Sequence, residues 1–231
     1  MKINIEKFDF QSDRILTSLK EADRRKFLSQ SESLTFKKGK LIFYEGGIPT
    51  GAFLITKGRA KIFKTGLDGK DQIFYIYNDG DMLGYHALLC DEKYEDSCEA
   101  TEDCEVLFIN KENFSRLLNQ IANLKLLFIQ NMSHEFGVLV NTITVLAQKP
   151  LRERLAIYLL ILRKRYMDDD NPEGEIRLPR EDLANLIGTA RESLGRLLKE
   201  FREEQLIEIN SRHLKLLSID RLNRIASSEY V

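Results

Sequence analysis

A chain of 231 residues with 43% hydrophobic and 31% charged residues is long enough for two compact domains with their own cores. Its formal net charge of −1 excludes a protein that binds nucleic acid through bulk positive charge alone. The sequence has no run that approaches a transmembrane span, no signal-peptide core near its start and no Cys-x-x-Cys pair, so we expect a reducing cytoplasm and no membrane partner.

The sequence pattern of the N-terminal half is typical of a β domain. Residues 12–29 favour a short helical region, and short apolar runs then alternate with glycine-containing turns from Ser33 to Phe108. Strands at this spacing are typical of a sandwich or barrel. We therefore predict a β jelly-roll sensor domain over residues 1–118.

Helical patterns follow the strands. Lys111–Leu118 predicts a short helix and Asn119–Gln148 a long one, which Pro150 ends. We predict a dimerisation helix and hinge over residues 119–149, because an apolar stripe steps along it by three and four residues. The alternative is that this helix lies on its own β domain, and it can do both. The predicted dimer seam is Leu124, Phe128, Met132, Phe136, Leu139, Ile143 and Leu146.

Residues 150–231 form a third predicted region with three helices, the last of which is amphipathic. Leu151–Tyr166 favours one helix, and Leu178–Glu208 favours two more joined by a turn at Gly188. On a helical wheel of residues 191–202 the apolar side chains fall on one side. The other side carries Arg191, Glu192, Gly195, Arg196, Lys199 and Arg202. An ordinary solvated surface helix would show the same wheel.

A hairpin follows the two helices. Leu206–Ile209 and Leu214–Leu217 predict two short strands around a turn at residues 210–212. Helix, helix-turn-helix and hairpin is the order of a winged helix, which makes the whole chain an α+β protein. Residues 150–231 hold 15 Lys and Arg against 15 Asp and Glu, so DNA binding would depend on where the charges lie.

The segment GTARESLGRLLKEFREEQLIE, residues 188–208, resembles the DNA-binding signature of the Crp/Fnr superfamily of bacterial transcription regulators. Its Arg191-Glu192-x-x-x-Arg196 pattern is more similar to the cyclic AMP receptor protein branch than to the fumarate-nitrate regulator branch. GAFLITKGRAKIF resembles the core hairpin of the cyclic-nucleotide-binding jelly roll, and GDMLGYHALL the start of its phosphate-binding cassette. The resemblance covers Leu34 to Leu217.

The resemblance implies a dimeric regulator, not an enzyme, that reads a palindromic site in double-stranded DNA, with RNA polymerase as a further partner. Arginine can bond guanine and glutamate can accept from cytosine, so Arg191, Glu192 and Arg196 are the expected base contacts. We expect phosphate contacts from Thr189, Ser193 and Lys199.

The effector is expected in the β domain, at a pocket near Gly84, Tyr85 and His86. Relatives that bind cyclic AMP hold its phosphate with a cassette arginine, yet residues 84–103 contain no arginine and seven acidic residues. A phosphate diester needs fixed donors and positive potential. We therefore expect an unknown small-molecule effector other than cyclic AMP.

Other sensing chemistries would use cysteine or histidine side chains. An iron–sulfur cluster needs about four thiolates, and this chain has three cysteines, so no cluster or other metal is expected. Haem stays open, with His86 and His134 as candidate axial ligands and Met132 nearby. A thiol sensor is disfavoured because the surroundings of Cys90, Cys98 and Cys104 are acidic. A winged helix that binds proteins instead of DNA is the remaining alternative.

Overall fold

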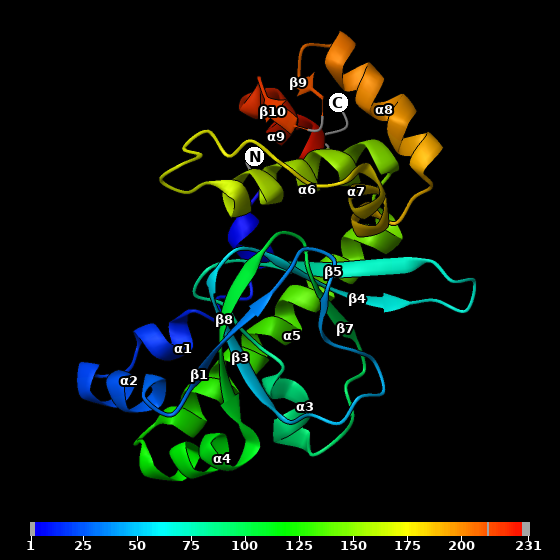
Figure 1. Cartoon of the computed structure of the whole chain (residues 1–231). Helices are drawn as coiled ribbons and strands as arrows, with labels where there is room; N and C mark the ends of the chain where they lie inside the picture. The colour runs from blue at the N-terminus through cyan, green and yellow to red at the C-terminus, as the bar shows by residue number, and fades with distance from the viewer. Residues whose placement is uncertain (1–2, 212, 228–231) are drawn as a thin grey trace. The chain divides into compact units, whose positions relative to one another are not determined.

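The computed structural model describes residues 3–211 and 213–227, and Figure 1 labels most of its elements. The chain divides into two compact units. The β unit comprises Phe10–Gly66 and Ile73–Gly137. The C-terminal unit comprises the described residues of Met1–Asp9, Leu67–Gln72 and Val138–Val231.

Two four-stranded sheets form the framework of the β unit. One sheet has the strand order β1 (Glu32–Phe36), β8 (Cys104–Asn110), β3 (Gly51–Lys57), β6 (Met82–Leu83). The other has the order β2 (Leu41–Phe43), β7 (Ser97–Ala100), β4 (Ala60–Thr65), β5 (Asp71–Tyr77). Neighbours such as β1 and β8 are antiparallel although distant in sequence. Two antiparallel sheets with such crossovers confirm the predicted jelly-roll class.

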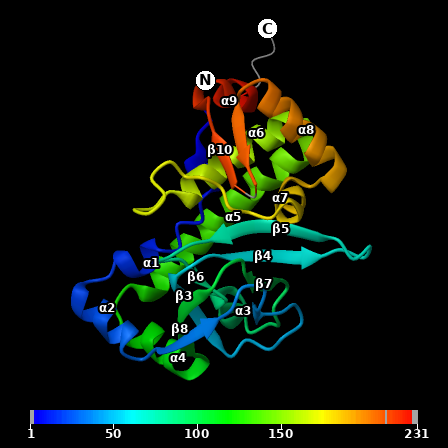
Figure 2. The same ribbon diagram turned by 45° about the horizontal axis from the view of Figure 1, so that its top comes forward.

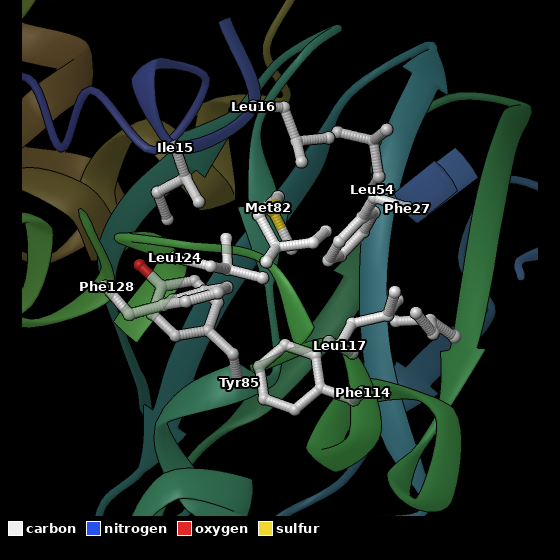
Figure 3. Packing of buried hydrophobic residues seen from close by; sticks show 13 residues of the cluster. Ile15, Leu16, Phe27, Leu54, Met82, Tyr85, Phe114, Leu117, Leu124 and Phe128 are labelled. Atoms are coloured by element: carbon white, nitrogen blue, oxygen red, sulfur yellow. The ribbon is translucent and has the colours of Figure 1, made fainter. Parts of the chain in front are cut away.

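Helices complete the core of the β unit. They are α1 (Arg14–Thr17), α2 (Glu21–Leu28), α3 (Tyr85–Cys90), α4 (Lys111–Gln120) and the start of α5 (Leu124–Gln148). Side chains from α1 to α5 meet strand residues such as Leu54 and Met82 in one hydrophobic cluster, part of which Figure 3 shows. Tyr85, Leu124 and Phe128 belong to this cluster, so α3 and α5 are packed on the same core.

This packing corrects the N-terminal part of the predicted dimer seam. Leu124 is 0% exposed and Phe128 is 1% exposed, and both lie in the core of the β unit, against which Met132 also packs. These three residues pack the helix against its own β domain, as the alternative interpretation of the apolar stripe expects. Phe136, Leu139 and Ile143 are exposed, and Leu146 is half-buried.

A different apolar stripe on α5 faces solvent. It repeats at three- and four-residue steps, the spacing of a coiled-coil seam. Its large members are Leu126, Ile129, Phe136, Val140 and Ile143, between 45% and 70% exposed. The exposed Ser133 occupies the step between Ile129 and Phe136. The face available to a partner is therefore rotated around the helix from the predicted seam.

The C-terminal unit contains the expected winged helix-turn-helix. Its elements are α6 (Leu151–Tyr166), α7 (Arg180–Ile187), α8 (Arg191–Glu203), β9 (Ile207–Asn210), β10 (His213–Leu216) and α9 (Ile219–Ser227). β9 and β10 pair antiparallel, and Figure 2 shows this hairpin beside α8. Arg212, in the predicted turn of the hairpin, lies outside the described residues.

The N-terminal segment belongs to the C-terminal unit. After a short 3-10 helix (Ile5–Phe8), Asp9 accepts hydrogen bonds from Arg165 at 2.8 Å and from Lys164 at 3.1 Å. Lys164 also bonds Glu6 at 2.6 Å. Burial alone would raise the pKa of Asp9, but the charges and hydrogen bonds of the two cations lower it overall. These ion pairs hold the start of the chain on α6.

Over the described ranges 3–211 and 213–227, the helices are all too short or too polar to cross a membrane.

Candidate functional site

The corner between α7 and α8 sets the start of the candidate recognition helix. Gly188 has φ of +64°, a left-handed conformation that glycine adopts without a side-chain clash, and Thr189 N donates to Ala184 O to close the turn. The N-cap of α8 is Ala190, which has no side-chain capping bond. Thr189 therefore does not cap α8, and the first amide groups of α8 receive no hydrogen bond from an N-cap side chain.

The two sides of α8 have opposite surroundings. Leu194, Leu197, Leu198 and Phe201 are buried, as the helical wheel predicts. Arg191, Glu192, Gly195, Arg196 and Lys199 are exposed, and Ser193 is half-buried. The apolar side thus anchors the helix and leaves a continuous polar face open to solvent.

Two arginines of α6 hydrogen-bond to the ends of α7 and α8. Arg152 Nη2 donates to both carboxylate oxygens of Glu204 at 2.7 and 2.8 Å, and its guanidinium lies 4.9 Å from the Phe201 ring centroid. The hydrogen bond from Arg152 lowers the pKa of Glu204. Arg154 Nη1 donates to Ile187 O at 2.9 Å and Gly188 O at 3.2 Å, so it caps the end of α7. Sequence reasoning missed both roles.

Among the described residues, the α8 side chains expected to contact DNA make long contacts. Arg191 lies 3.9 Å from Glu181, Arg196 lies 3.4 Å from the Ser193 hydroxyl, and Lys199 lies 3.8 Å from Glu203. Exposed ion pairs of this kind contribute about 0–1 kcal/mol. Their donors can therefore turn to another acceptor at little cost.

A cleft of about 330 Å³ runs beside this face. Four cationic residues line it, together with Gly195 and the apolar Leu194, Leu198 and Ile209; the cations are Arg180, Arg191, Lys199 and Arg202. Arg180, the first residue of α7, is half-buried, and its buried Nη2 has no hydrogen-bond partner within the described part of the chain. Burial lowers the pKa of Arg180. The cleft offers unsatisfied donors and positive charge, which suits an anionic oxygen.

Sequence reasoning also missed Arg180. The signal that could have found it is its position at the start of the helix before the turn, because the first helix of a helix-turn-helix crosses the DNA backbone.

The residues of the predicted effector pocket lie at the start of α3. Gly84 has φ of +77°, and a β-carbon there would lie 3.2 Å from the Phe53 ring and 3.3 Å from Tyr94 Oη, so close packing explains the glycine. Tyr85 is fully buried, and the ring of the half-exposed His86 stacks on it with a centroid distance of 4.3 Å. Tyr85 therefore forms part of the core.

A polar network joins α3 to α5. Glu135, 3% exposed, accepts from Tyr85 Oη at 2.6 Å and from Asn131 Nδ2 at 2.8 Å, and its other oxygen lies 2.5 Å from His86 Nε2. Asn131 Nδ2 also donates to Tyr85 Oη at 2.9 Å. Burial and the nearby Glu135 charge raise the pKa of Tyr85, which keeps its phenol protonated and donating.

The charges in this region do not fit a cyclic phosphate. Burial raises the pKa of Asp96 to about 6, although the charge of His86 opposes the shift. Glu135 is a second acid beside His86. A phosphate diester requires donors and positive potential, whereas these side chains supply acceptors and negative charge. The side chains around His86 therefore do not fit a cyclic nucleotide.

The two haem-ligand candidates do not converge. His86 engages Glu135, whereas His134 lines a groove beside α1 on another side of α5. The thiol-sensor reading is disfavoured for two cysteines, because Cys98 and Cys104 are buried. Burial raises the pKa of Cys98 far above its usual range and that of Cys104 to about 11, so both remain thiols. Cys90 is exposed.

Comparison with protein families gives two matches. Residues 33–121 match the cyclic nucleotide-binding domain, and residues 153–225 match the Crp-like helix-turn-helix domain. The two segments coincide with the strands of the β unit and with the winged helix-turn-helix.

Curated relatives span most of the chain. The cyclic AMP receptor protein of Thermus thermophilus is 25% identical over 86% of this chain and 90% of its own length. The transcriptional regulatory protein btr of Bordetella pertussis is 28% identical over 86% and 82%. The fumarate and nitrate reduction regulatory protein of Vibrio cholerae is 25% identical over 82% and 76%.

Solved structures share the fold. FixK2 from Bradyrhizobium japonicum superposes with a TM-score of 0.76 at 19% identity, over 84% of this chain and 96% of that one. The c-di-GMP responsive regulator CLP of Xanthomonas campestris gives a TM-score of 0.73 at 20% identity, over 86% and 100%. With both domains and their order matched, the chain belongs to the Crp/Fnr family of DNA-binding transcription regulators.

Proposed function

We propose that two copies of this chain read a palindromic DNA site, each with one α8 in a major groove. Arg191, Glu192 and Arg196 contact base edges, and Thr189, Ser193 and Lys199 contact phosphates. The exposure of these side chains, apart from the half-buried Thr189 and Ser193, and the long contacts that hold them support this assignment. The observation that carries the proposal is the division of α8 into a buried apolar side and an exposed polar side.

Arg180 adds one residue to the proposed interface. Its Nη2 is buried and has no acceptor among the residues that the structure describes, and an unsatisfied charged group costs more than a neutral one. A DNA phosphate in the cleft beside Arg191, Lys199 and Arg202 would supply the acceptor. The uncapped start of α8 would contribute amide groups to the same strand.

We propose that the dimer forms along the exposed stripe of α5, from Leu126 to Ile143. Crp/Fnr regulators act as dimers, and a partner copy would bury apolar side chains that are now half or more exposed at Ile129, Phe136 and Ile143. Of the seven residues predicted for the seam, this interface keeps Phe136 and Ile143, with Leu139 at its edge.

Regulation would act through α5. A small molecule that binds the β unit would shift the packing of the two α5 helices, and bending near Pro150 would then space the α8 helices about 34 Å apart, one DNA turn. We expect an effector other than a cyclic nucleotide, in keeping with the acids around His86. The cytoplasm and RNA polymerase are the expected location and partner of a regulator that acts on the chromosome.

The test is selection of binding sites by the purified full-length protein from a pool of random duplex DNA. We expect an enriched palindrome whose half-site centres are one helical turn apart. Sedimentation of the complex should show two chains per duplex.

The matched control is the double variant Arg191→Ala/Arg196→Ala, whose substituted residues are exposed and lie outside the core. It should fold normally and enrich no palindrome. Enrichment of the same palindrome by this variant, or of a non-repeated site by the wild type, would contradict the proposed interface.

A further inference from the structure

A second candidate binding site lies in the β unit, away from α3. It is a groove of about 250 Å³ between the α1 region and one side of α5. Arg14, Ser18, Gln130 and His134 contribute polar groups to its lining. At about 30 Å³ per water molecule, the groove has room for roughly eight waters, the size of a small metabolite.

The walls of the groove are fixed before any ligand binds. Ile15 is buried in the same hydrophobic cluster as Leu124 and Phe128, and Figure 3 shows Ile15 directed toward Leu124. Just before α1, Ser12 Oγ donates to Asp81 at 2.8 Å and accepts from Met82 N at 3.1 Å. A preformed site loses little conformational entropy when it binds a ligand.

The chemistry of the lining favours an anion. Arg14 and His134 are the two basic residues of the lining, which contains no carboxylate. The Arg14 guanidinium has no hydrogen-bond or ionic partner among residues 3–211 and 213–227. Ile15 and Leu127 add apolar contact area. A guanidinium presents paired donors that match the oxygens of a carboxylate or phosphate.

We propose that the groove between α1 and α5 binds a small metabolite that carries a carboxylate or phosphate group, with Arg14 and His134 holding the anion. This site does not depend on DNA binding.

The groove stays open in the proposed dimer. At about 100° per residue, its α5 residues are centred roughly 140° around the helix from the exposed stripe that runs from Leu126 to Ile143. A partner helix on the stripe would therefore leave Arg14 and His134 accessible.

The groove also touches the network that joins α3 to α5. Asn131, 8% exposed, is part of the lining, and its Nδ2 donates to Glu135 and Tyr85. Glu135 in turn contacts His86 of α3. A ligand in the groove would therefore contact a residue that is hydrogen-bonded to the α3–α5 junction.

The experiment is titration of the full-length protein, without DNA, with succinate, glycerol 3-phosphate and uncharged glycerol, followed by calorimetry and by amide chemical shifts. We expect saturable binding of at least one anion with Kd below about 10 mM, no binding of glycerol, and shift changes at Ser18 and His134. Whichever anion binds more tightly identifies the carboxylate or the phosphate as the preferred group.

Variants distinguish binding in the groove from non-specific attraction of anions to surface cations. Arg14→Gln and His134→Gln replace exposed side chains and should each weaken binding about tenfold, whereas Arg24→Gln, an exposed arginine on α2, should leave Kd unchanged. Failure of both anions to saturate, or equal binding by the Arg14→Gln/His134→Gln double variant, would overturn the proposal. Neither result bears on DNA recognition, because no DNA is present.

Discussion

Glu135 organises the junction between α3 and α5. Removing a carboxylate from water costs several kcal/mol unless hydrogen bonds replace the solvent. Tyr85, Asn131 and His86 provide those bonds, two of them at 2.6 and 2.8 Å. Because the bonds come from both helices, losing one partner would leave a buried charge less satisfied and would loosen α3 from α5.

Asp96 makes the stability of the β unit depend on pH. Its folded pKa of about 6 lies above the usual 3.8, so the folded state holds a proton that the unfolded state releases. Stability is therefore lost as pH rises from about 3.8 through 6. The full penalty above pH 7 is about 3 kcal/mol, at about 1.36 kcal/mol per unit.

We predict that Asp96→Asn raises the free energy of unfolding by up to about 3 kcal/mol at pH 7.5, because the amide never takes a charge. The gain should shrink toward zero as pH falls toward 4, where Asp96 is protonated in both states. Urea denaturation at several pH values measures this difference. A gain that does not vary with pH would show that charge burial is not its cause.

At the same scale, Arg196→Ala should weaken binding of the selected duplex by about 1–3 kcal/mol and relax the preference at one base pair of each half-site. Fluorescence anisotropy on a set of single-base variants measures both effects. Arg224→Ala removes an exposed cation from α9 and is the control. Equal losses for the two variants would point to general charge rather than base reading.

The exposure of these α8 residues could be predicted from sequence. The hydrogen bonds of Glu135 and the partial burial of Arg180 could not. The buried side of an amphipathic helix is visible in the sequence because apolar residues recur every three or four positions, and the apolar residues from Leu194 to Phe201 do so. The bonds of Glu135 join residues about 50 positions apart, and the partial burial of Arg180 depends on how α7 and α8 pack. Single-sequence periodicity carries no information on such pairings.

At the scale of elements, α5 carries apolar residues around much of its circumference. Leu124 and Phe128 face the core of the β unit, whereas Ile129 and Phe136 face solvent. Both sets repeat at three- and four-residue steps, so the sequence predicts a seam without showing which apolar residues the domain itself covers. The predicted seam consequently mixed residues from the two faces.

Phe136→Glu should dissociate the dimer, since the charge would lie in the middle of the exposed stripe. Sedimentation velocity should show a monomer at concentrations where the wild type is dimeric, with an unchanged thermal transition of the β unit. Gln148→Glu, which places the same charge on an exposed part of α5 off the stripe, is the control and should remain dimeric. A dimeric Phe136→Glu protein would place the interface elsewhere.

Replacing Gly195 in α8 with alanine should raise the stability of the protein and lower its affinity for DNA. A β-carbon there would meet nothing within 4 Å, so Gly195→Ala should raise the free energy of unfolding by about 0.5–1 kcal/mol through helix propensity. Affinity for the selected duplex should fall about tenfold, because the added methyl faces the proposed DNA surface.

Gly137→Ala is the matched control, since Gly137 also lies inside a helix with open space around its β position. It should raise stability without lowering DNA affinity. If Gly195→Ala left DNA affinity unchanged, α8 would not approach DNA at Gly195.

At the scale of the whole molecule, the balance of charges predicts a regulator with weak non-specific binding. Residues 150–231 have equal numbers of acidic and basic residues, 15 of each, so attraction of phosphate depends on local clusters such as the four cations around the cleft. Affinity for random DNA should therefore be low, and two copies acting together should be needed for tight binding.

Lys199→Gln should reduce the magnitude of the slope of log K against log salt by about 2 for a dimer, since each lost phosphate contact removes about 0.9. The loss of affinity should be similar for every DNA sequence, because a phosphate contact carries no base information. Titrations at four salt concentrations test this. A sequence-dependent loss with an unchanged slope would instead place Lys199 against a base.

The attachment of the chain's start to α6 has a practical consequence. A protease that cut α5 near Gly137 would divide the chain into two fragments. Glu6 and Asp9 of the N-terminal fragment would still form ion pairs with Lys164 and Arg165 of the C-terminal fragment. Concentrated salt or acid would weaken this attachment, because salt screens the ion pairs and acid protonates the carboxylates. A DNA-binding fragment prepared from residue 138 onward would lack Glu6 and Asp9, the carboxylates that Lys164 and Arg165 bind.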